Sequence, residues 1–139
     1  MPEESTTPDL VERWKRLLEA ASSGDLDVVQ SMYAPDAVWE VLSLGLRLEG
    51  AAAILGFIED WRGSYGELET EPEEVIDLGH EVLFGVFLQK GRPVGSTGHV
   101  QVRVAQVTTW ADGLLVQTTG YLDPDEARAA AERLAEERG

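Results

Sequence analysis

The sequence predicts an α+β fold in which helices and a strongly curved antiparallel sheet form a cone with an internal pocket. Three observations support this class. Apolar residues recur at helical spacing in the first third of the chain, apolar and polar residues alternate from His99 to Arg103, and Asp112-Gly113 is typical of a tight turn between two strands. Helices therefore come first and strands follow, with one further helix inserted between them.

Two helices are expected at the start of the chain, after a frayed tail over residues 1–6. Thr7 and Pro8 are typical of an N-cap and a first helical position, and Gly24 is typical of a helix end. Asp25 is expected to cap a second, short helix that runs to Tyr33. The apolar faces of these two helices carry Leu10, Trp14, Leu17, Leu18 and Ala21, then Leu26, Val29 and Met32.

The middle of the chain predicts short strands around one helix. A turn at 34–36 leads into a first strand over 37–41, a loop or short strand follows over 43–48, and a third helix covers 51–61. Residues 68–77 are acidic and include Pro72, so they predict an edge strand at most. A strongly apolar strand is expected over 81–89, and a loop over 90–95.

A long hairpin over residues 98–122 organises the rest of the sheet. Its first strand is expected to turn Val100, Val102, Val104, Gln106, Thr108 and Trp110 inward, and to turn His99, Gln101, Arg103, Ala105, Val107 and Thr109 outward. Asp123 then caps a final helix over 124–138. The whole chain, 1–139, is expected to be one domain.

Composition excludes several classes of function. The net charge of −15 and the pI of about 4.3 argue against nucleic-acid binding. The sequence has no cysteine, so thiolate chemistry and disulfides are excluded, and neither His80 nor His99 has acidic neighbours at metal-ligand spacing. No metal or other cofactor is therefore expected. The acidic, polar start and the lack of a long apolar run predict a cytoplasmic protein outside the membrane.

Six short motifs stand out along the chain: Gly24–Asp27, Tyr33–Trp39, Leu48–Ile54, Glu74–Leu83, Ala111–Leu115 and Tyr121–Ala127. Together they resemble the SnoaL-like branch of the nuclear-transport-factor-2-like (NTF2-like) superfamily. The motifs span about residues 9–130, and each is weak alone. The resemblance implies the NTF2-like cone, an internal pocket and a homodimer, but no single chemistry.

The catalytic residues of two related enzyme classes are largely missing at the matching positions. Where ketosteroid isomerases place a phenol, a general-base aspartate and a second acid, this sequence has Leu17, Val41 and Gln106. Where limonene-epoxide hydrolases place their arginine and two aspartates, it has Val86, Leu88 and Gly120. The resemblance therefore implies neither reaction, although the Gln106 amide can still donate a hydrogen bond.

The candidate site is an apolar pocket with few polar groups. Gln106 is the candidate catalytic residue, because a polar group in an apolar pocket orients a ligand; the alternative is that it bridges backbone groups. The tryptophans suit either core packing or walls for a flat ligand, and Tyr65 lies near the expected pocket mouth. The expected substrate-binding residues are Trp14, Trp39, Val41, Trp61, Tyr65, Phe84, Val86, Leu88, Thr108, Trp110 and Thr118.

Three functions remain open from the sequence. The first is a cofactor-free isomerase, cyclase or lyase that acts on an apolar oxygenated compound. The second is a non-catalytic binder of a small hydrophobic ligand, and the third is a dimeric interaction module. A homodimer is expected through the outer sheet face, with His99, Gln101 and Arg103 and with Gln117, Thr119 and Tyr121. A strand bulge would exchange the inner and outer faces of this strand and turn His99 and Arg103 into the pocket.

Overall fold

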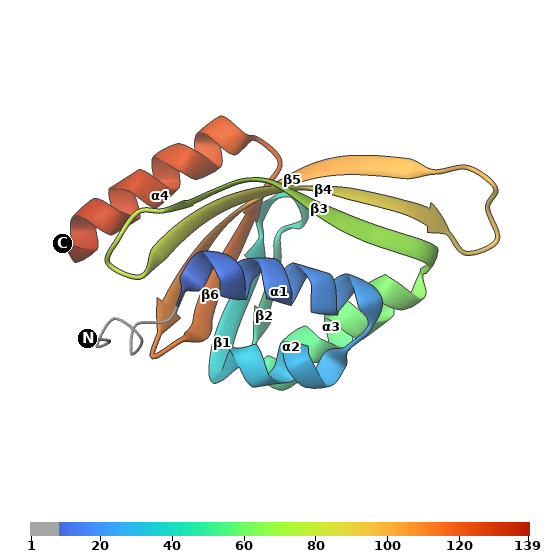
Figure 1. Ribbon diagram of the computed structural model, residues 1–139, viewed down its shortest axis with the longest axis horizontal. Helices are drawn as coiled ribbons and strands as arrows, with labels where there is room; N and C mark the ends of the chain where they lie inside the picture. The colour runs from blue at the N-terminus through green and yellow to red at the C-terminus, as the bar shows by residue number, and fades with distance from the viewer. Residues whose placement is uncertain (1–8) are drawn as a thin grey trace.

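The computed structural model describes residues 9–139, which form one curved sheet with helices on both of its faces (Figure 1). The described elements are α1 (Leu10–Ser23), α2 (Leu26–Met32), β1 (Tyr33–Val41), a 3-10 helix (Leu42–Leu44), β2 (Leu46–Glu49), α3 (Ala51–Gly63), β3 (Tyr65–Asp77), β4 (Val82–Pro93), β5 (Val100–Ala111), β6 (Leu114–Tyr121) and α4 (Pro124–Arg138). The α+β class is confirmed.

The six strands lie in the order β2-β1-β6-β5-β4-β3. Four of the neighbouring pairs are antiparallel, but β1 and β6 run parallel, which differs from the fully antiparallel sheet predicted. Parallel neighbours need a long connection rather than a tight turn. The chain between β1 and β6 contains a 3-10 helix, one α-helix and four strands, so no turn imposes an antiparallel direction on this pair.

Helices α1, α2 and α3 cover one face of the sheet, and α4 lies on the opposite face (Figure 1). The larger core forms on the first side, where Trp14 and Leu17 of α1 and Ile54 of α3 pack with Leu83 and Phe87 of β4. The pocket-forming side of the molecule is therefore the side of the N-terminal helices.

Helix α4 builds a second core on the outer face of β4 and β5. Its alanines at positions 127, 131 and 135 follow one another at four-residue spacing and are buried, which lets the helix approach the sheet closely. They pack on Val82, Phe84, Val86, Ala105 and Val107. Helix α4 therefore covers part of the outer sheet face through which a homodimer was expected.

Several boundaries differ from those predicted. Asp9 caps α1 by accepting a hydrogen bond from the backbone N–H of Glu12, whereas the predicted cap at Thr7 and Pro8, like the tail over 1–6, lies outside the described residues. Strand β1 begins at Tyr33, so the predicted turn at 34–36 is extended backbone. The predicted caps Asp25 and Asp123 are confirmed.

The β4–β5 end of the sheet extends past the helices (Figure 1). Strand β4 continues to Pro93, where a loop was predicted, and β3 is a thirteen-residue edge strand with an irregularity after Pro72. Val100 and Val102 are 42% and 40% exposed, so they are not core residues. The alternation predicted their face correctly, but no helix reaches them.

Candidate functional site

A cavity of about 220 Å³ lies between the sheet and helices α1 and α3. Its apolar wall includes Trp39 and Val41 of β1, Phe57 and Trp61 of α3 and Phe87 of β4. Trp39 meets Phe57 edge to face, with ring centroids 5.2 Å apart and an angle of 89° between the rings. This arrangement is typical of a binding site for a flat, apolar molecule.

Two glycines flank Gln106 on the neighbouring strands and decide what surrounds it. Gly120 of β6 is its partner on one side and Gly85 of β4 on the other. A Cβ atom on Gly85 would overlap the ring of Trp14, so only glycine lets that indole lie against the sheet. Gly120 lines the cavity, and its lack of a side chain leaves that space open beside Gln106.

The orientation of the Gln106 amide follows from its partner. The indole Nε1 of Trp14 donates a hydrogen bond to the side-chain oxygen of Gln106 at 3.0 Å. An indole N–H can only donate, so the amide oxygen must face Trp14 and the NH₂ group is left for other partners. Gln106 lines the cavity, and its amide is therefore a hydrogen-bond donor for a ligand.

Trp39 and Thr118 lie side by side in the parallel pairing of β1 with β6, and both line the cavity. The indole Nε1 of Trp39 and the hydroxyl of Thr118 are buried and have no hydrogen-bond partner among the described residues. Buried polar atoms are almost always paired. Both residues were predicted for the site from the sequence.

Tyr33 is a cavity residue that the sequence analysis missed. It lies at the start of β1, and burial raises the pKa of its phenol well above its ordinary value. The phenol therefore stays protonated and able to donate over the physiological pH range. The sequence analysis missed Tyr33 because it predicted a turn at residues 34–36. That turn placed Tyr33 at the end of a helix instead of the start of a strand.

Gln89, Thr70, Ser43 and Tyr121 are further polar residues of the cavity that were not predicted for it, and Tyr121 was expected on the outer face instead. The Gln89 amide nitrogen donates to the Tyr65 hydroxyl at 3.4 Å, and the Thr70 hydroxyl donates to the backbone carbonyl of Leu18 at 3.3 Å. Tyr65 was predicted to contact a ligand, but it lies behind Gln89 and packs edge to face on Trp61. It supports the wall rather than forming it.

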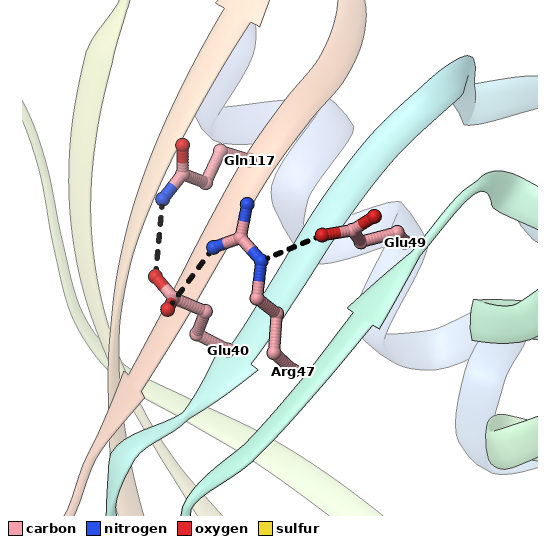
Figure 2. A network of polar contacts seen from close by, with 4 residues as sticks. All are labelled: Glu40, Arg47, Glu49 and Gln117. Carbon is pink, nitrogen blue, oxygen red and sulfur yellow. Dashed lines mark hydrogen bonds and ion pairs between the residues drawn. The ribbon is translucent and has the colours of Figure 1, made fainter.

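Charged side chains are absent from the described wall of this cavity. Strand alternation explains the case of Glu40, which lies between the inward residues Trp39 and Val41. Figure 2 shows its carboxylate on the other face of the sheet, bonded to Arg47 at 3.1 Å and to the Gln117 amide at 3.4 Å. Arg47 is in turn bonded to Glu49 at 2.9 Å. Glu40 therefore cannot serve as a general base in the pocket.

Phe84, Val86 and Leu88 do not line the cavity, contrary to the prediction. Strand β4 pairs Phe84 with Val107 and Val86 with Ala105, on the face that α4 covers. Leu88 shares that face by alternation. Residues 82–87 are all apolar because both faces of β4 are buried, so the sequence carried no alternation from which to choose the inward set.

Thr108, Trp110 and Trp14 are core residues rather than cavity residues. The Trp110 indole donates to the Thr108 hydroxyl at 2.8 Å, which satisfies both groups inside the core. Trp14 is fully buried, and it acts on the site only by orienting Gln106. Among the predicted residues, the cavity brings together Trp39, Val41, Trp61, Gln106 and Thr118.

His99 and Arg103 stay outside the cavity. The Arg103 guanidinium bonds the carboxylate of Glu73 on β3 at 2.6 Å, and this pair keeps the pKa of Glu73 below its ordinary value. A bulge is present between β5 and β6 at Thr109 and Trp110, but it lies beyond Arg103 and does not reverse that part of β5. Within residues 9–139, no cluster of acidic or histidine side chains could hold a metal ion.

The family model of the SnoaL-like domain matches residues 14–118 of this sequence. The chain belongs to the SnoaL-like family. No curated protein matches it. As the family resemblance implied, the ketosteroid-isomerase positions Leu17, Val41 and Gln106 all line the cavity of this SnoaL-like protein, and none is an acid. Of the three epoxide-hydrolase positions, only Gly120 does so.

Solved structures similar to this SnoaL-like chain share its fold. An NTF2-like protein of unknown function from Burkholderia pseudomallei is 21% identical, with a TM-score of 0.71 over 86% of this chain and 95% of that one. A putative SnoaL-like polyketide cyclase from Jannaschia is 21% identical, with a TM-score of 0.70 over 88% and 91%. A hypothetical protein with a ketosteroid isomerase-like fold from Catenulispora acidiphila, in complex with trimethylamine, is 15% identical, with a TM-score of 0.72 over 91% and 94%.

None of the helices within residues 9–139 of this SnoaL-like protein has the length and apolar character needed to cross a membrane. The cytoplasmic location stays a prediction.

Proposed function

We propose that this SnoaL-like protein binds one small, apolar, oxygen-bearing molecule in the cavity between the sheet and helices α1 and α3. The observation that carries this proposal is the wall itself, in which aromatic and aliphatic side chains enclose about 220 Å³ around a few hydrogen-bonding groups. Burial of apolar ligand surface supplies the attraction, at roughly 25 cal/mol per Å² before the costs of association. The polar groups then set the orientation of the ligand.

Catalysis without a cofactor is the second candidate function, as an isomerase, cyclase or lyase. The Gln106 amide and the Tyr33 phenol are donors in an apolar cavity, and such donors stabilise negative charge that develops on a carbonyl oxygen. The name of the Jannaschia neighbour, a putative polyketide cyclase, favours this class. Ligand binding ranks first because the described wall contains no Asp, Glu or His to act as a general base.

A screen by native mass spectrometry tests both functions. The protein is incubated with a library of flat hydrocarbons, ketones and phenols of one to three rings, and bound compounds are identified before and after prolonged incubation. One-to-one complexes are expected with compounds of one or two rings. Recovery of a compound in altered form would place the protein among the enzymes, and recovery of unaltered compounds supports a binder.

A matched pair of variants shows whether the bound compounds occupy this cavity. Gly120→Leu places a side chain in the cavity from β6, and Thr119→Leu places the same side chain at the next residue, on the opposite face of the strand. Complexes should be lost in the first variant and kept in the second. Equal binding by both variants, or no binding in the whole screen, would contradict the proposal.

A homodimer is the proposed assembly, through the part of the outer sheet face that α4 leaves free. This part includes Glu40 of β1, Arg47 and Glu49 of β2 and Gln117 of β6, which form the polar network of Figure 2. A surface that carries both charges and amides suits pairing with a second copy better than a uniformly acidic one. Light scattering at micromolar concentration should give twice the chain mass, and a monomer mass would contradict the assembly.

A further inference from the structure

Two residues that line the cavity from adjacent strands each carry a buried polar atom without a partner among the described residues. The indole Nε1 of Trp39 and the hydroxyl of Thr118 are both buried without a partner in the described part of the chain, and Thr118 is only 2% exposed. The two residues are direct neighbours in the β1–β6 pairing and both line the cavity. Because an unsatisfied buried polar group is costly, the pair indicates a position where an atom of a ligand completes the hydrogen bonding.

The chemistry of the pair limits what that atom can be. An indole N–H only donates, while a threonine hydroxyl donates or accepts, so a group that bonds both must be an acceptor. The free NH₂ group of Gln106 adds a third donor on the same wall. All three donors are uncharged. The complementary atom is therefore an oxygen with acceptor character, such as a carbonyl oxygen.

Charge decides between a carbonyl compound and a carboxylate. None of the lining residues in the described chain is Lys or Arg, so a carboxylate would be buried without a counter-ion. The chain carries a net charge of −15, which also disfavours the approach of an anion. An amine cation is disfavoured for a different reason, because the wall offers it donors and no carboxylate.

The volume limits the size of the molecule. Cavities of about 150 Å³ in protein cores accommodate benzene, so about 220 Å³ leaves room for a second fused ring. We propose that Trp39 and Thr118 form an anchoring site for the carbonyl oxygen of an uncharged, bicyclic-sized ketone or quinone. This inference rests on the proposed function and assigns its ligand class and its two anchoring residues.

The test compares three bicyclic probes: 1-tetralone with a carbonyl, tetralin without one, and 1-naphthoate with a charge. Calorimetry with the wild-type protein should give an affinity for tetralone about fivefold above that for tetralin, the worth of one neutral hydrogen bond. Naphthoate should bind more weakly than either. In a ¹H–¹⁵N spectrum the Trp39 indole signal should shift with tetralone, and should move less with tetralin.

Three variants test which side chains cause the preference for tetralone over tetralin. Thr118→Val and Trp39→Phe should each reduce the tetralone-to-tetralin affinity ratio toward one. Thr119→Val makes the same change on the opposite face of β6 and should keep the wild-type ratio. The Thr118 variant is close to isosteric, so a loss of folding in Trp39→Phe leaves one side of the pair testable.

The possible failures are distinguishable. If tetralin and tetralone bind equally well to the wild-type protein, the cavity binds apolar molecules but the anchoring site is wrong. If Thr119→Val lowers the ratio as much as Thr118→Val, the same conclusion holds. If none of the three probes binds at millimolar concentration, both the anchoring site and the proposed function are contradicted.

Discussion

The side-chain oxygen of Gln106 on β5 accepts a hydrogen bond from the indole Nε1 of Trp14 on α1, at 3.0 Å. This bond joins the helical layer to the sheet at the wall of the cavity, 92 residues apart in sequence. It satisfies a buried indole and fixes the Gln106 amide with its NH₂ group available to a ligand. One contact thus serves both the packing of the core and the polarity of the site.

Gln106→Leu should lower both stability and affinity for a carbonyl ligand. Removing the acceptor leaves the buried Trp14 indole unpaired, which should reduce the free energy of unfolding by about 1–3 kcal/mol. Loss of the free NH₂ group should weaken tetralone binding by about 1 kcal/mol and affect tetralin little. Urea unfolding and calorimetry measure the two effects.

A double-mutant cycle with Trp14→Phe isolates the bond itself. The two substitutions should be less than additive in unfolding free energy, with a coupling of about 1 kcal/mol. Full additivity would show that the Trp14–Gln106 contact contributes nothing to stability.

Gly85→Ala and Gly120→Ala should have opposite consequences although both glycines flank Gln106. The new Cβ at position 85 overlaps the Trp14 ring, so thermal unfolding should show a loss of about 1–3 kcal/mol. The new Cβ at position 120 makes only ordinary contact, 3.7 Å from the Glu40 backbone oxygen, and it projects into the cavity. That variant should fold normally and bind less ligand. A stable Gly85→Ala protein would contradict the packing described for Trp14.

Tyr33 should make the protein less stable at alkaline pH. Burial raises the pKa of its phenol in the folded state above its value of about 10 in the unfolded chain. Above pH 10 the unfolded chain loses this proton while the folded chain keeps it, so ionisation favours unfolding and stability falls as pH rises.

Tyr33→Phe removes that dependence. The stability difference between wild type and variant, measured in urea at pH 8 and at pH 10.5, should shift in favour of the variant at the higher pH. Parallel losses in both proteins would show that Tyr33 does not titrate with a raised pKa.

The affinity for an uncharged ligand should be independent of pH between about 5.5 and 9. The described cavity wall has no Asp, Glu, His, Lys or Arg, and its buried phenol Tyr33 stays protonated in this range. Calorimetric titration with tetralone at four pH values checks this. A dissociation constant that changes more than about threefold would indicate an ionisable group at the site that the structure does not place there.

Ala131→Leu should destabilise the protein, whereas Ala129→Leu should not. Ala131 is fully buried between α4 and the outer face of the sheet, and a larger side chain there costs about 1–3 kcal/mol. Ala129 is exposed on the same helix and serves as the control for helix propensity. Equal unfolding midpoints in guanidinium would mean that α4 does not pack as described.

Local sequence patterns predicted the elements and much of the site. Alternation sends Trp39 and Val41 inward and Glu40 outward, and the same rule places Gln106 and Thr118 on the inner face. The helical spacing of Leu17 and Trp14 predicted a core face, and the Asp112-Gly113 turn predicted the hairpin. Each of these depends on local periodicity, which a single chain displays directly.

The packing of distant elements, in contrast, determines which face of β4 meets the cavity, and it adds Tyr33 of β1 to the site. Residues 82–87 are buried on both faces because α4 covers the outer one, and a strand buried on both faces has no alternation to interpret. Phe87 rather than Phe84 therefore lines the cavity, and Tyr33 enters it because residues 34–36 extend the strand. These outcomes depend on which distant elements pack together, and local sequence does not encode that choice in any one segment.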